Sequence, residues 1–220
     1  MKGYEIIQTG SSGNAVLFGG CVLVDCGVSY KKIEPYLDSI KLVLLTHVHG
    51  DHFKPSTIRR LALEKPKLLF VGGYHMAHPL VEASVPKRQI YIVEPRKLYG
   101  FGICNVIPFE LEHDVPNLGY KIQFPDWKVF YATDMANLNG ISAKDYDLYA
   151  VEANYQKDEI KARMDEKAAE GVYAYEHRVL RNHMSKEDCD NWLVRNMGPK
   201  SEFMYLHCHK EEENERNQEG

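Results

Sequence analysis

The chain has 220 residues, of which 44% are hydrophobic and 26% charged, and this composition is that of an ordinary globular protein. The length suits one domain, or two closely fused halves, with a large buried core. No apolar run reaches the length that a membrane-spanning helix needs. Residues 1–7 read as a strand and lack the basic and apolar regions of a signal peptide, so we expect a cytoplasmic protein.

The formal charge of −4 is concentrated at the C-terminal end. Residues 211–220 hold five glutamates and one arginine, which leaves residues 1–210 nearly neutral. We therefore predict a single domain over residues 1–210 and an acidic, disordered tail over residues 211–220. The nearly neutral part lacks the strong basic surplus of a protein that coats nucleic acid. Five cysteines without a CxxC pair indicate reduced, mostly buried thiols.

Short apolar runs separated by turn residues predict many strands along the chain. In chain order they cover residues 5–7, 15–18, 21–24, 42–45, 67–71, 90–93, 105–110, 119–124, 129–132, 148–152 and 203–206. Helical patterns fit residues 31–36, 56–63, 75–82, 158–169 and 186–197. Ser185 suits the N-cap of the last helix, with Asp188 three residues on as a loose capping box. This layout indicates the α/β class.

The run Thr46-His47-Val48-His49-Gly50-Asp51-His52 follows the strand predicted at residues 42–45. Imidazole and carboxylate groups are the ligands of Zn²⁺, Mn²⁺ and related cations. His47 and His49 are two residues apart, so in extended backbone they point to the same side and can grip one metal ion. Gly50 lets the chain turn, and Asp51 and His52 then face a second position. The run predicts a metal-binding loop.

The spacing His-x-His-x-Asp-His resembles that of the metallo-β-lactamase superfamily, and further motifs follow in the family's order. They are Asp25-Cys26-Gly27 as the turn that supports the metal loop, His113 within Glu112-His113-Asp114, Asp134 after an apolar strand, and His207 after the last strand. The resemblance covers residues 4 to about 210. It implies an αββα sandwich of two mixed sheets with outer helices, in which the strand ends carry the site.

For the site, the resemblance implies two divalent metal ions. The first would be held by His47, His49 and His113, and the second by Asp51, His52 and His207, with Asp134 bridging the two. The absence of cysteine from this set favours Zn²⁺ or Mn²⁺. Two such ions can share a water and make hydroxide available near neutral pH. Asp51 would orient that water and accept its proton.

A narrower likeness is to the YycJ-type branch, a set of DNA exonuclease-like hydrolases related to RNase Z. It rests on Gly10-Ser11-Ser12-Gly13-Asn14, on Val24-Asp25-Cys26-Gly27, and on the segment from Arg178 to Asp188. In this branch a His-x-Ser element assists the chemistry, which implies that His183 is catalytic together with Asp51. Tyr155 stands where a histidine is expected. The substrate-binding residues implied are Ser12, Asn14, Arg181 and Ser185.

Plainer interpretations stand beside these. For His183 the alternative is a helix-start histidine satisfied by a cap, and for residues 10–14 it is a hairpin turn. His75 and His78, three apart on a helix, suit surface or core histidines better than a metal pair. Cys208 lies between two histidines, but strand geometry turns its side chain away from theirs, which favours a packed cysteine.

The function predicted is a metal-dependent phosphodiesterase or nuclease acting on DNA or RNA. The alternative is a hydrolase of a small molecule, either a cyclic phosphodiester or a thioester or lactone, which the nearly neutral charge of residues 1–210 favours. A catalytically silent metal-binding module is disfavoured because no ligand position is lost. Metal identity, DNA against RNA, the polarity of cleavage and the oligomeric state stay open at this point.

Overall fold

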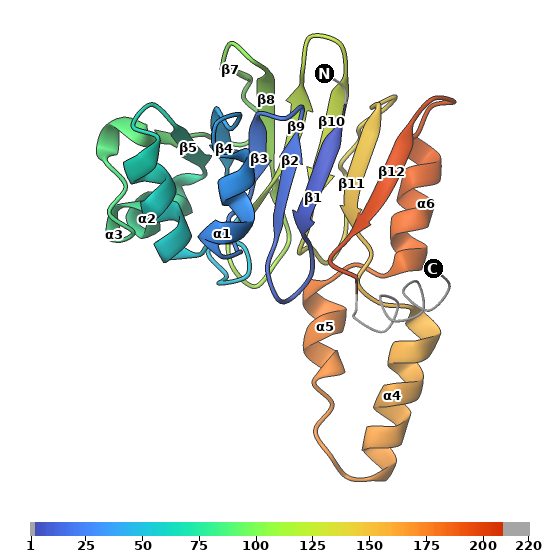
Figure 1. The fold of residues 1–220 in the computed structure, drawn as a ribbon. Coiled ribbons are helices and arrows are strands. Elements are labelled where there is room, and N and C mark those ends of the chain that lie inside the picture. The colour runs from blue at the N-terminus through green and yellow to red at the C-terminus, as the bar shows by residue number, and fades with distance from the viewer. Residues whose placement is uncertain (1–2, 209–220) are drawn as a thin grey trace. The chain divides into compact units, whose positions relative to one another are not determined.

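The computed structural model describes residues 3–208, and their contacts divide the chain into two compact units (Figure 1). The first unit comprises Met1–Glu110 and Val115–Trp127, and the second comprises Leu111–Asp114 and Lys128–Gly220. The acidic tail predicted at residues 211–220 lies outside the described residues, and the single domain predicted over residues 1–210 stays a prediction. Among the described residues, no helix combines the length and apolar character needed to cross a membrane.

The first unit contains a six-stranded mixed sheet whose spatial order follows the chain. Its strands are β1 (Tyr4–Gln8), β2 (Ala15–Phe18), β3 (Val22–Val24), β4 (Leu42–Leu44), β5 (Leu69–Gly72) and β6 (Ile90–Ile92). The first two pairings are antiparallel, and β3 to β6 run parallel. Strands β2, β3 and β4 are buried along their whole length. This explains why they read as continuous apolar runs rather than alternating ones.

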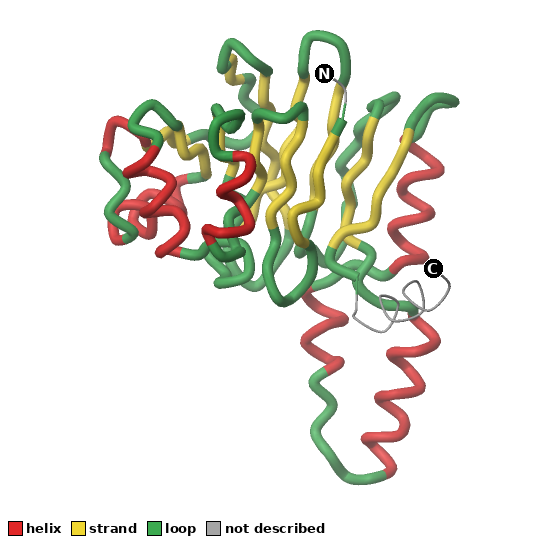
Figure 2. Tube along the Cα trace, viewed as in Figure 1, coloured by secondary structure: helices red, strands yellow, loops and turns green. Residues whose placement is uncertain are grey.

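Short helices pack on this sheet. They are α1 (Tyr30–Ile33), α2 (Pro55–Glu64) and α3 (Ala77–Glu82), with 3₁₀ turns at Glu34–Tyr36, Tyr74–Met76 and Lys87–Gln89. Figure 2 shows them as tubes beside the strands. Helix α2 starts with Pro55 at its first turn and turns Ile58, Leu61 and Ala62 into the core formed with β2 to β5. The unit also holds β7 (Tyr99–Gly100), β8 (Asn105–Leu111) and β9 (Asn117–Gln123), of which β7 and β8 are antiparallel.

The second unit is built on three parallel strands, β10 (Lys128–Ala132), β11 (Leu148–Glu152) and β12 (Glu202–Leu206), in that order. Strand β11 is central and buried throughout. Helix α6 (Lys186–Asn196) covers them, with Trp192 stacked on Phe130. Helices α4 (Lys157–Ala169) and α5 (Glu176–Asn182) run side by side and project from these strands as a helical hairpin (Figure 1).

Every strand predicted from the sequence is present, with ends that differ by at most two residues. The helices predicted at residues 31–36 and 75–82 are each part α-helix and part 3₁₀ turn. Pro35 explains the first change, since its ring removes an N–H donor from a continuous helix. Besides the 3₁₀ turn at Lys87–Gln89, two described elements were not predicted, β7 and α5. Both are short, and α5 buries only two of its seven residues, so it has no apolar stripe to recognise.

Candidate metal centre

The metal-binding loop predicted at residues 46–52 follows β4 in the first unit. Thr46, His47 and His52 are fully buried, whereas His49 and Asp51 are partly exposed. The backbone N–H groups of His52 and Phe53 both donate to the His49 carbonyl, at 2.9 and 2.7 Å, so the loop closes as a tight turn. The turn fixes the direction in which the donor side chains leave the backbone.

Asp25 anchors this loop from the turn after β3. Its carboxylate accepts the Thr46 backbone N–H at 2.9 Å, the Thr46 hydroxyl at 2.9–3.0 Å and His52 Nδ1 at 2.7 Å. Burial raises the pKa of Asp25, while the hydrogen bonds from His52 and Thr46 oppose that rise. Asp25 also has a left-handed backbone with φ of 62°. Such a conformation is costly and is kept where the surroundings require it.

These hydrogen bonds decide which ring nitrogens can bind a cation. The single Thr46 hydroxyl proton goes to the Asp25 carboxylate, which can only accept. The Thr46 oxygen therefore accepts from His47 Nδ1–H at 2.9 Å, and His47 Nε2 keeps its lone pair. His52 donates from Nδ1 to Asp25, so its Nε2 also keeps a lone pair. A histidine that donates one ring N–H to a carboxylate or hydroxyl is oriented as metal ligands usually are.

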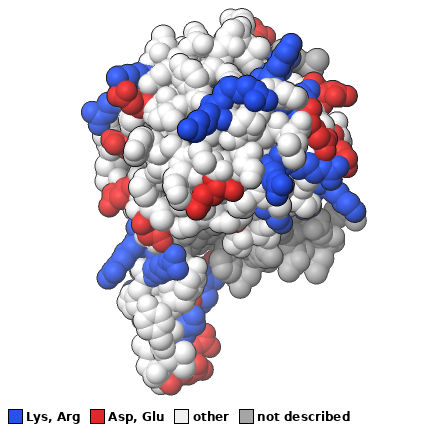
Figure 3. Space-filling model, turned by 90° about the vertical axis from the view of Figure 1, so that its left-hand side faces the viewer, with Lys and Arg blue, Asp and Glu red and all other residues white. Residues whose placement is uncertain are grey.

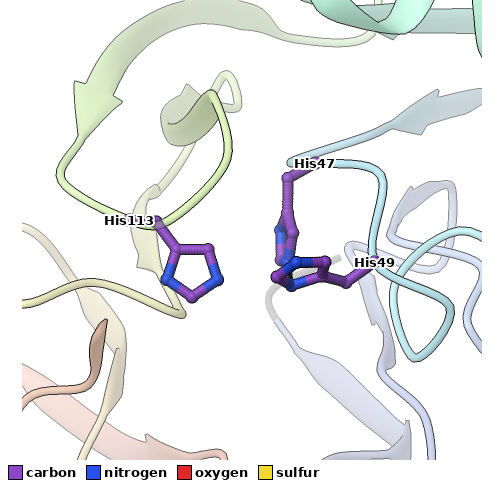
Figure 4. A group of neighbouring side chains, drawn as sticks. All are labelled: His47, His49 and His113. Carbon is purple, nitrogen blue, oxygen red and sulfur yellow. Dashed lines mark hydrogen bonds between the residues drawn. The ribbon is translucent and has the colours of Figure 1, made fainter. Parts of the chain in front are cut away.

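His47 and His49 converge as a pair of ligands would (Figure 4). His47 Nε2 lies 3.2 Å from His49 Nδ1. Two nitrogens bound to a tetrahedral Zn²⁺ at 2.0–2.1 Å lie about 3.3 Å apart. The donor spacing within the first unit therefore fits a divalent cation.

Gly27 and Asn14 hold the loop from its other side. A Cβ at Gly27 would lie 1.7 Å from the Asp51 carbonyl oxygen, so only glycine fits there. Asn14 is buried; its backbone N–H donates to the Asp51 carbonyl at 2.6 Å and its side-chain nitrogen lies 2.8 Å from His52 Nε2. Ser12 is exposed and accepts a hydrogen bond from Gln8. The roles of Asn14 and Ser12 in substrate binding stay predictions, since the observed contacts are within the fold.

In the second unit His113 follows β8 (Figure 4). Its Nδ1 lies 3.1 Å from the Asn182 carbonyl oxygen and its Nε2 lies 3.2 Å from Asp114 Oδ1, so each ring nitrogen faces an oxygen acceptor. Burial lowers the pKa of His113, so its ring is neutral at pH 7. A neutral imidazole is the form that binds a metal ion.

Four further donors gather at the carboxyl ends of β10, β11 and β12. They are Asp134, Glu152, His183 and His207, and one ligand atom of each lies within 4.8 Å of the others. Asp134 Oδ1 is 3.4 Å from His207 Nε2 and 3.5 Å from His183 Nδ1. Parallel strands end at the same edge of a sheet, which is why residues far apart in the sequence meet here. The second unit therefore has its own group of side chains that could hold a metal ion.

The backbone at this edge has an unusual conformation. Asp134 and His207 both have φ of 53°, in the left-handed region that non-glycine residues rarely adopt. Asn154 holds His207, with its side-chain nitrogen 2.9 Å from His207 Nδ1 and 3.0 Å from the His207 carbonyl oxygen. Strained residues kept at strand ends, with dedicated partners, suggest a functional constraint on where these side chains point.

His183 contacts acidic side chains. In the sequence it lies between the basic residues Arg181 and Lys186, but its Nδ1 donates to Glu152 Oε1 at 2.6 Å. Burial lowers the pKa of His183, and the hydrogen bond and charge of Glu152, with Asp134, outweigh burial and raise it above the ordinary value. Residues close in sequence can point in different directions at the end of a helix. Arg181 is two residues from His183, and it is exposed. His183 therefore lies beside two carboxylates that favour its protonated form.

Ser185 has the predicted N-cap role at the start of α6. Its oxygen accepts the Asp188 backbone N–H at 3.1 Å, and its hydroxyl donates to Asp188 Oδ2 at 2.8 Å. The predicted N-cap is thus confirmed, with Asp188 as its partner, while substrate binding by Ser185 and Arg181 stays a prediction. His75 is half-buried against the Thr46 carbonyl and His78 is exposed beside Glu82, as expected of histidines outside a metal site.

Sequence reasoning missed Glu152 as a site residue. It is fully buried at the end of β11, and besides His183 it accepts the Met135 backbone N–H at 2.9 Å. Its position in the sequence could have indicated a role. Glu152 is an acidic residue at the end of the apolar strand Leu148–Glu152, and Asp134 likewise comes just after β10. A carboxylate at the end of an apolar strand is buried only where a partner satisfies it, which makes such a position a candidate donor.

Comparisons with known proteins agree with this arrangement. Residues 21–187 match the family model described as "Beta-lactamase superfamily domain". The exodeoxyribonuclease WalJ of Streptococcus pneumoniae is 27% identical over 230 residues, which cover 94% of this chain and 82% of that protein. The metallo-β-lactamase fold protein YhfI of Bacillus subtilis superposes with a TM-score of 0.73 at 18% identity, covering 98% of this chain and 90% of that one. The short form of human tRNase Z superposes with a TM-score of 0.63 at 16% identity, covering 93% of this chain and 92% of that one.

The likeness to these solved structures confirms the predicted fold class, an αββα metallo-β-lactamase sandwich. The resemblance to the superfamily and to its exodeoxyribonuclease-like branch is confirmed as well.

Proposed function

Because the chain belongs to the beta-lactamase superfamily, we propose that it is a metal-dependent phosphodiesterase that cleaves nucleic acid. The observation that carries the proposal is the group at the ends of β10 to β12, where His183 is held by Glu152 beside Asp134 and His207. A hydrolase needs such a proton donor to assist a departing oxygen.

The donors suit two divalent cations of the Zn²⁺ or Mn²⁺ kind. They are imidazoles and carboxylates without a thiolate, the set that borderline and harder ions prefer. We propose His47, His49 and His113 for one cation, and Asp51, His52 and His207 for the other, with Asp134 shared. The oriented Nε2 atoms of His47 and His52 and the neutral ring of His113 support this assignment. When bound, such cations lower the pKa of a water molecule and offset charge on a phosphate.

The protein's own residues complete the reaction. Asp51 is the partly exposed carboxylate of the loop, so it can orient the attacking water and accept its proton. His183 has a raised pKa and is partly exposed, so it can donate a proton to the leaving oxygen. Glu152 is buried and accepts from His183 Nδ1, so it orients the ring and raises its pKa. A carboxylate and an imidazole in these positions are suited to act as base and acid.

A nucleic acid substrate is supported by the relatives, since the one from Streptococcus pneumoniae is named an exodeoxyribonuclease and the human one a tRNase. The second candidate is a small-molecule hydrolase for a cyclic phosphodiester, thioester or lactone. It is favoured by the near-zero charge of residues 1–210, which supplies little attraction for a polyanion. The cytoplasmic location expected from the sequence stays a proposal.

The test is an assay of cleavage products from end-labelled single- and double-stranded DNA and RNA, with Mn²⁺ and with Zn²⁺. We expect phosphodiester cleavage that chelator abolishes and that Asp51→Ala reduces to background. Asp126→Ala, which removes a carboxylate from an exposed turn of the same unit, should keep full activity. Elemental analysis should find close to two divalent ions per chain, and a ceiling of one would refute the two-ion assignment. Hydrolysis of an aryl thioester or lactone without cleavage of any phosphodiester would overturn the nuclease proposal.

A further inference from the structure

Several loops of the first unit meet at the sheet edge that carries the metal-binding loop. Strands β3, β4 and β5 are parallel, so residues 25–27, 46–52 and 73–76, which follow them, share that edge. The loop at residues 9–14 joins them, because β2 begins there antiparallel to β3. Neighbouring strands lie about 4.8 Å apart, so this loop edge extends over roughly 14 Å from β2 to β5. The metal-binding loop lies between residues 9–14 and residues 73–76.

Tyr74 lies on one side of the metal-binding loop. Tyr74 is 86% exposed, although the turn that carries it is tightly packed. Met76 is fully buried, and its backbone N–H donates to the Gly73 carbonyl at 2.9 Å. His75 Nε2 lies 3.0 Å from the Thr46 carbonyl oxygen, and a Cβ at Gly73 would lie 2.7 Å from the His75 ring. The fold therefore holds an aromatic ring in solvent on a fixed turn, which is a preorganised surface for stacking.

Lys32 and Ser12 offer hydrogen-bond donors on the other side of the metal-binding loop. Lys32 Nζ donates to Gln8 Oε1 at 2.6 Å, and Gln8 Nε2 donates to Ser12 Oγ at 2.8 Å. Within residues 3–208, the Ser12 hydroxyl proton and the remaining ammonium protons of Lys32 have no acceptor. Gln8 thus joins an exposed cation to an exposed hydroxyl donor. Donors of this kind bind the anionic oxygens of a phosphate group.

Positive charge is concentrated around the metal-binding loop. The segments 28–32 and 50–54 carry three exposed lysines, which are Lys31, Lys32 and Lys54. Asp51, the proposed metal ligand, is the one carboxylate that these segments contain. In Figure 3, by contrast, Lys and Arg side chains form separate groups with Asp and Glu among them, so the described part of that face carries no continuous basic surface. Attraction for a polyanion is therefore local, and these lysines supply it where cleavage is proposed.

We propose that the loop edge binds a single-stranded nucleic acid across the metal-binding loop, with one base stacked on Tyr74 and one phosphate held by Lys32 and Ser12. Stacking on aromatic rings and phosphate contacts with basic side chains together bind single strands with little regard to sequence. The inference rests on the proposed function for the class of substrate, and it deepens that function. It favours a linear strand over a small molecule, because the two contacts lie on opposite sides of the loop.

Binding tests the proposal without requiring cleavage. The metal-loaded full chain is titrated into a fluorescein-labelled thymidine hexanucleotide with phosphorothioate linkages, and fluorescence anisotropy gives the Kd. Six nucleotides span about 17 Å even at the 3.4 Å spacing of a helical strand, so the probe is long enough to reach both contacts. Tyr74→Ala should raise the Kd about tenfold, the usual size of losing one stacked base. Tyr74→Phe keeps the ring and should bind as the unchanged chain does.

A hexanucleotide backbone without bases separates stacking from a structural role of Tyr74. This probe carries the same linkages and offers no ring to stack, so Tyr74→Ala should change its Kd by less than about twofold. If Tyr74→Ala weakens the binding of both probes equally, the stacking contact is refuted.

Lys32→Gln tests the phosphate contact. The slope of log Kd against log salt should become shallower by about 0.7, the contribution of one phosphate in a single strand, and it should do so for both probes. The matched controls are Lys67→Gln and Leu63→Ala, which change exposed side chains at the opposite end of the same sheet, before β5 and at the end of α2. Both should stay within about twofold of the unchanged chain.

Equal effects of the site and control variants, or none in either, would overturn the proposal. So would a chain that is dimeric by light scattering, becomes monomeric on Tyr74→Ala and binds the hexanucleotide unaltered, since Tyr74 would then contact a second copy. The outcome is separable from the proposed function. A chain that binds through Tyr74 and Lys32 yet cleaves no phosphodiester keeps the binding edge and refutes the nuclease. An active chain insensitive at both residues does the reverse.

Discussion

Glu152→Gln is the sharpest test of how the second unit works, because the change keeps the shape of a fully buried side chain and removes its charge. Two backbone N–H groups, of Met135 at 2.9 Å and Met184 at 3.4 Å, point at one carboxylate oxygen. The glutamine oxygen must occupy that position, so its NH₂ group faces His183 Nδ1. His183 then has to accept at Nδ1, and its proton moves to Nε2.

The expected loss follows from the bond that is removed. The contact between His183 and Glu152 is a charge-assisted hydrogen bond of 2.6 Å between groups that are little exposed. Hydrogen bonds to charged groups contribute about 1.5–3 kcal/mol. At about 1.4 kcal/mol per factor of ten, kcat should fall roughly 10- to 150-fold with little change in KM. The pKa of His183 should also fall, because Glu152 raises it. The alkaline limb of the pH–rate profile should therefore move to lower pH.

The assay is single-turnover cleavage of a labelled oligonucleotide together with elemental analysis of the same preparation. Glu202→Gln, which neutralises a carboxylate at the exposed start of β12, is the matched control and should cleave at the full rate. Metal content should be unchanged in Glu152→Gln. A full cleavage rate would refute the positioning role, and loss of a metal ion would show that Glu152 is a ligand instead.

Three further predictions concern the late histidines, the metal loop and the hairpin. His207→Ala should lose one metal ion and all turnover. His183→Ala should keep both ions and slow cleavage by roughly 10²- to 10⁴-fold. If metal analysis shows that His183→Ala loses an ion and His207→Ala does not, the two roles are exchanged. Gly27→Ala places a Cβ 1.7 Å from the Asp51 carbonyl and should lower the unfolding free energy in urea by about 1–3 kcal/mol. Gly50→Ala meets nothing within 4 Å and is its control. Lys167 holds the pKa of Glu176 below its ordinary 4.5, with Arg163 adding to the effect. That contribution is present above pH 4.5 and lost as pH falls through the lowered value, so hydrogen exchange in residues 160–180 should rise there, and Lys167→Met should abolish the pH step.

Local pattern was sufficient for much of this protein. The buried strands of the first unit are continuous apolar runs, and the loop at residues 46–52 places its donors within seven consecutive residues. Alternation along extended backbone is enough to put His47 and His49 on one side, and their ring nitrogens are 3.2 Å apart. The N-cap at Ser185 was predictable for the same reason, since its partner Asp188 is three residues away.

Tertiary structure alone decided the contacts that join distant segments. His183 and Glu152 are 31 positions apart, and Asn154 and His207 are 53 apart. Parallel strands β11 and β12 and the C-terminal end of α5 bring these residues together, and no periodicity in the sequence records which side chains meet there. The same holds for the hairpin, because α4 buries only Ile160 along its length and α5 is too short to show a stripe. A cavity between them forms only when the two helices pack together. A sequence pattern reports neighbours along the chain, whereas a cavity depends on neighbours in space.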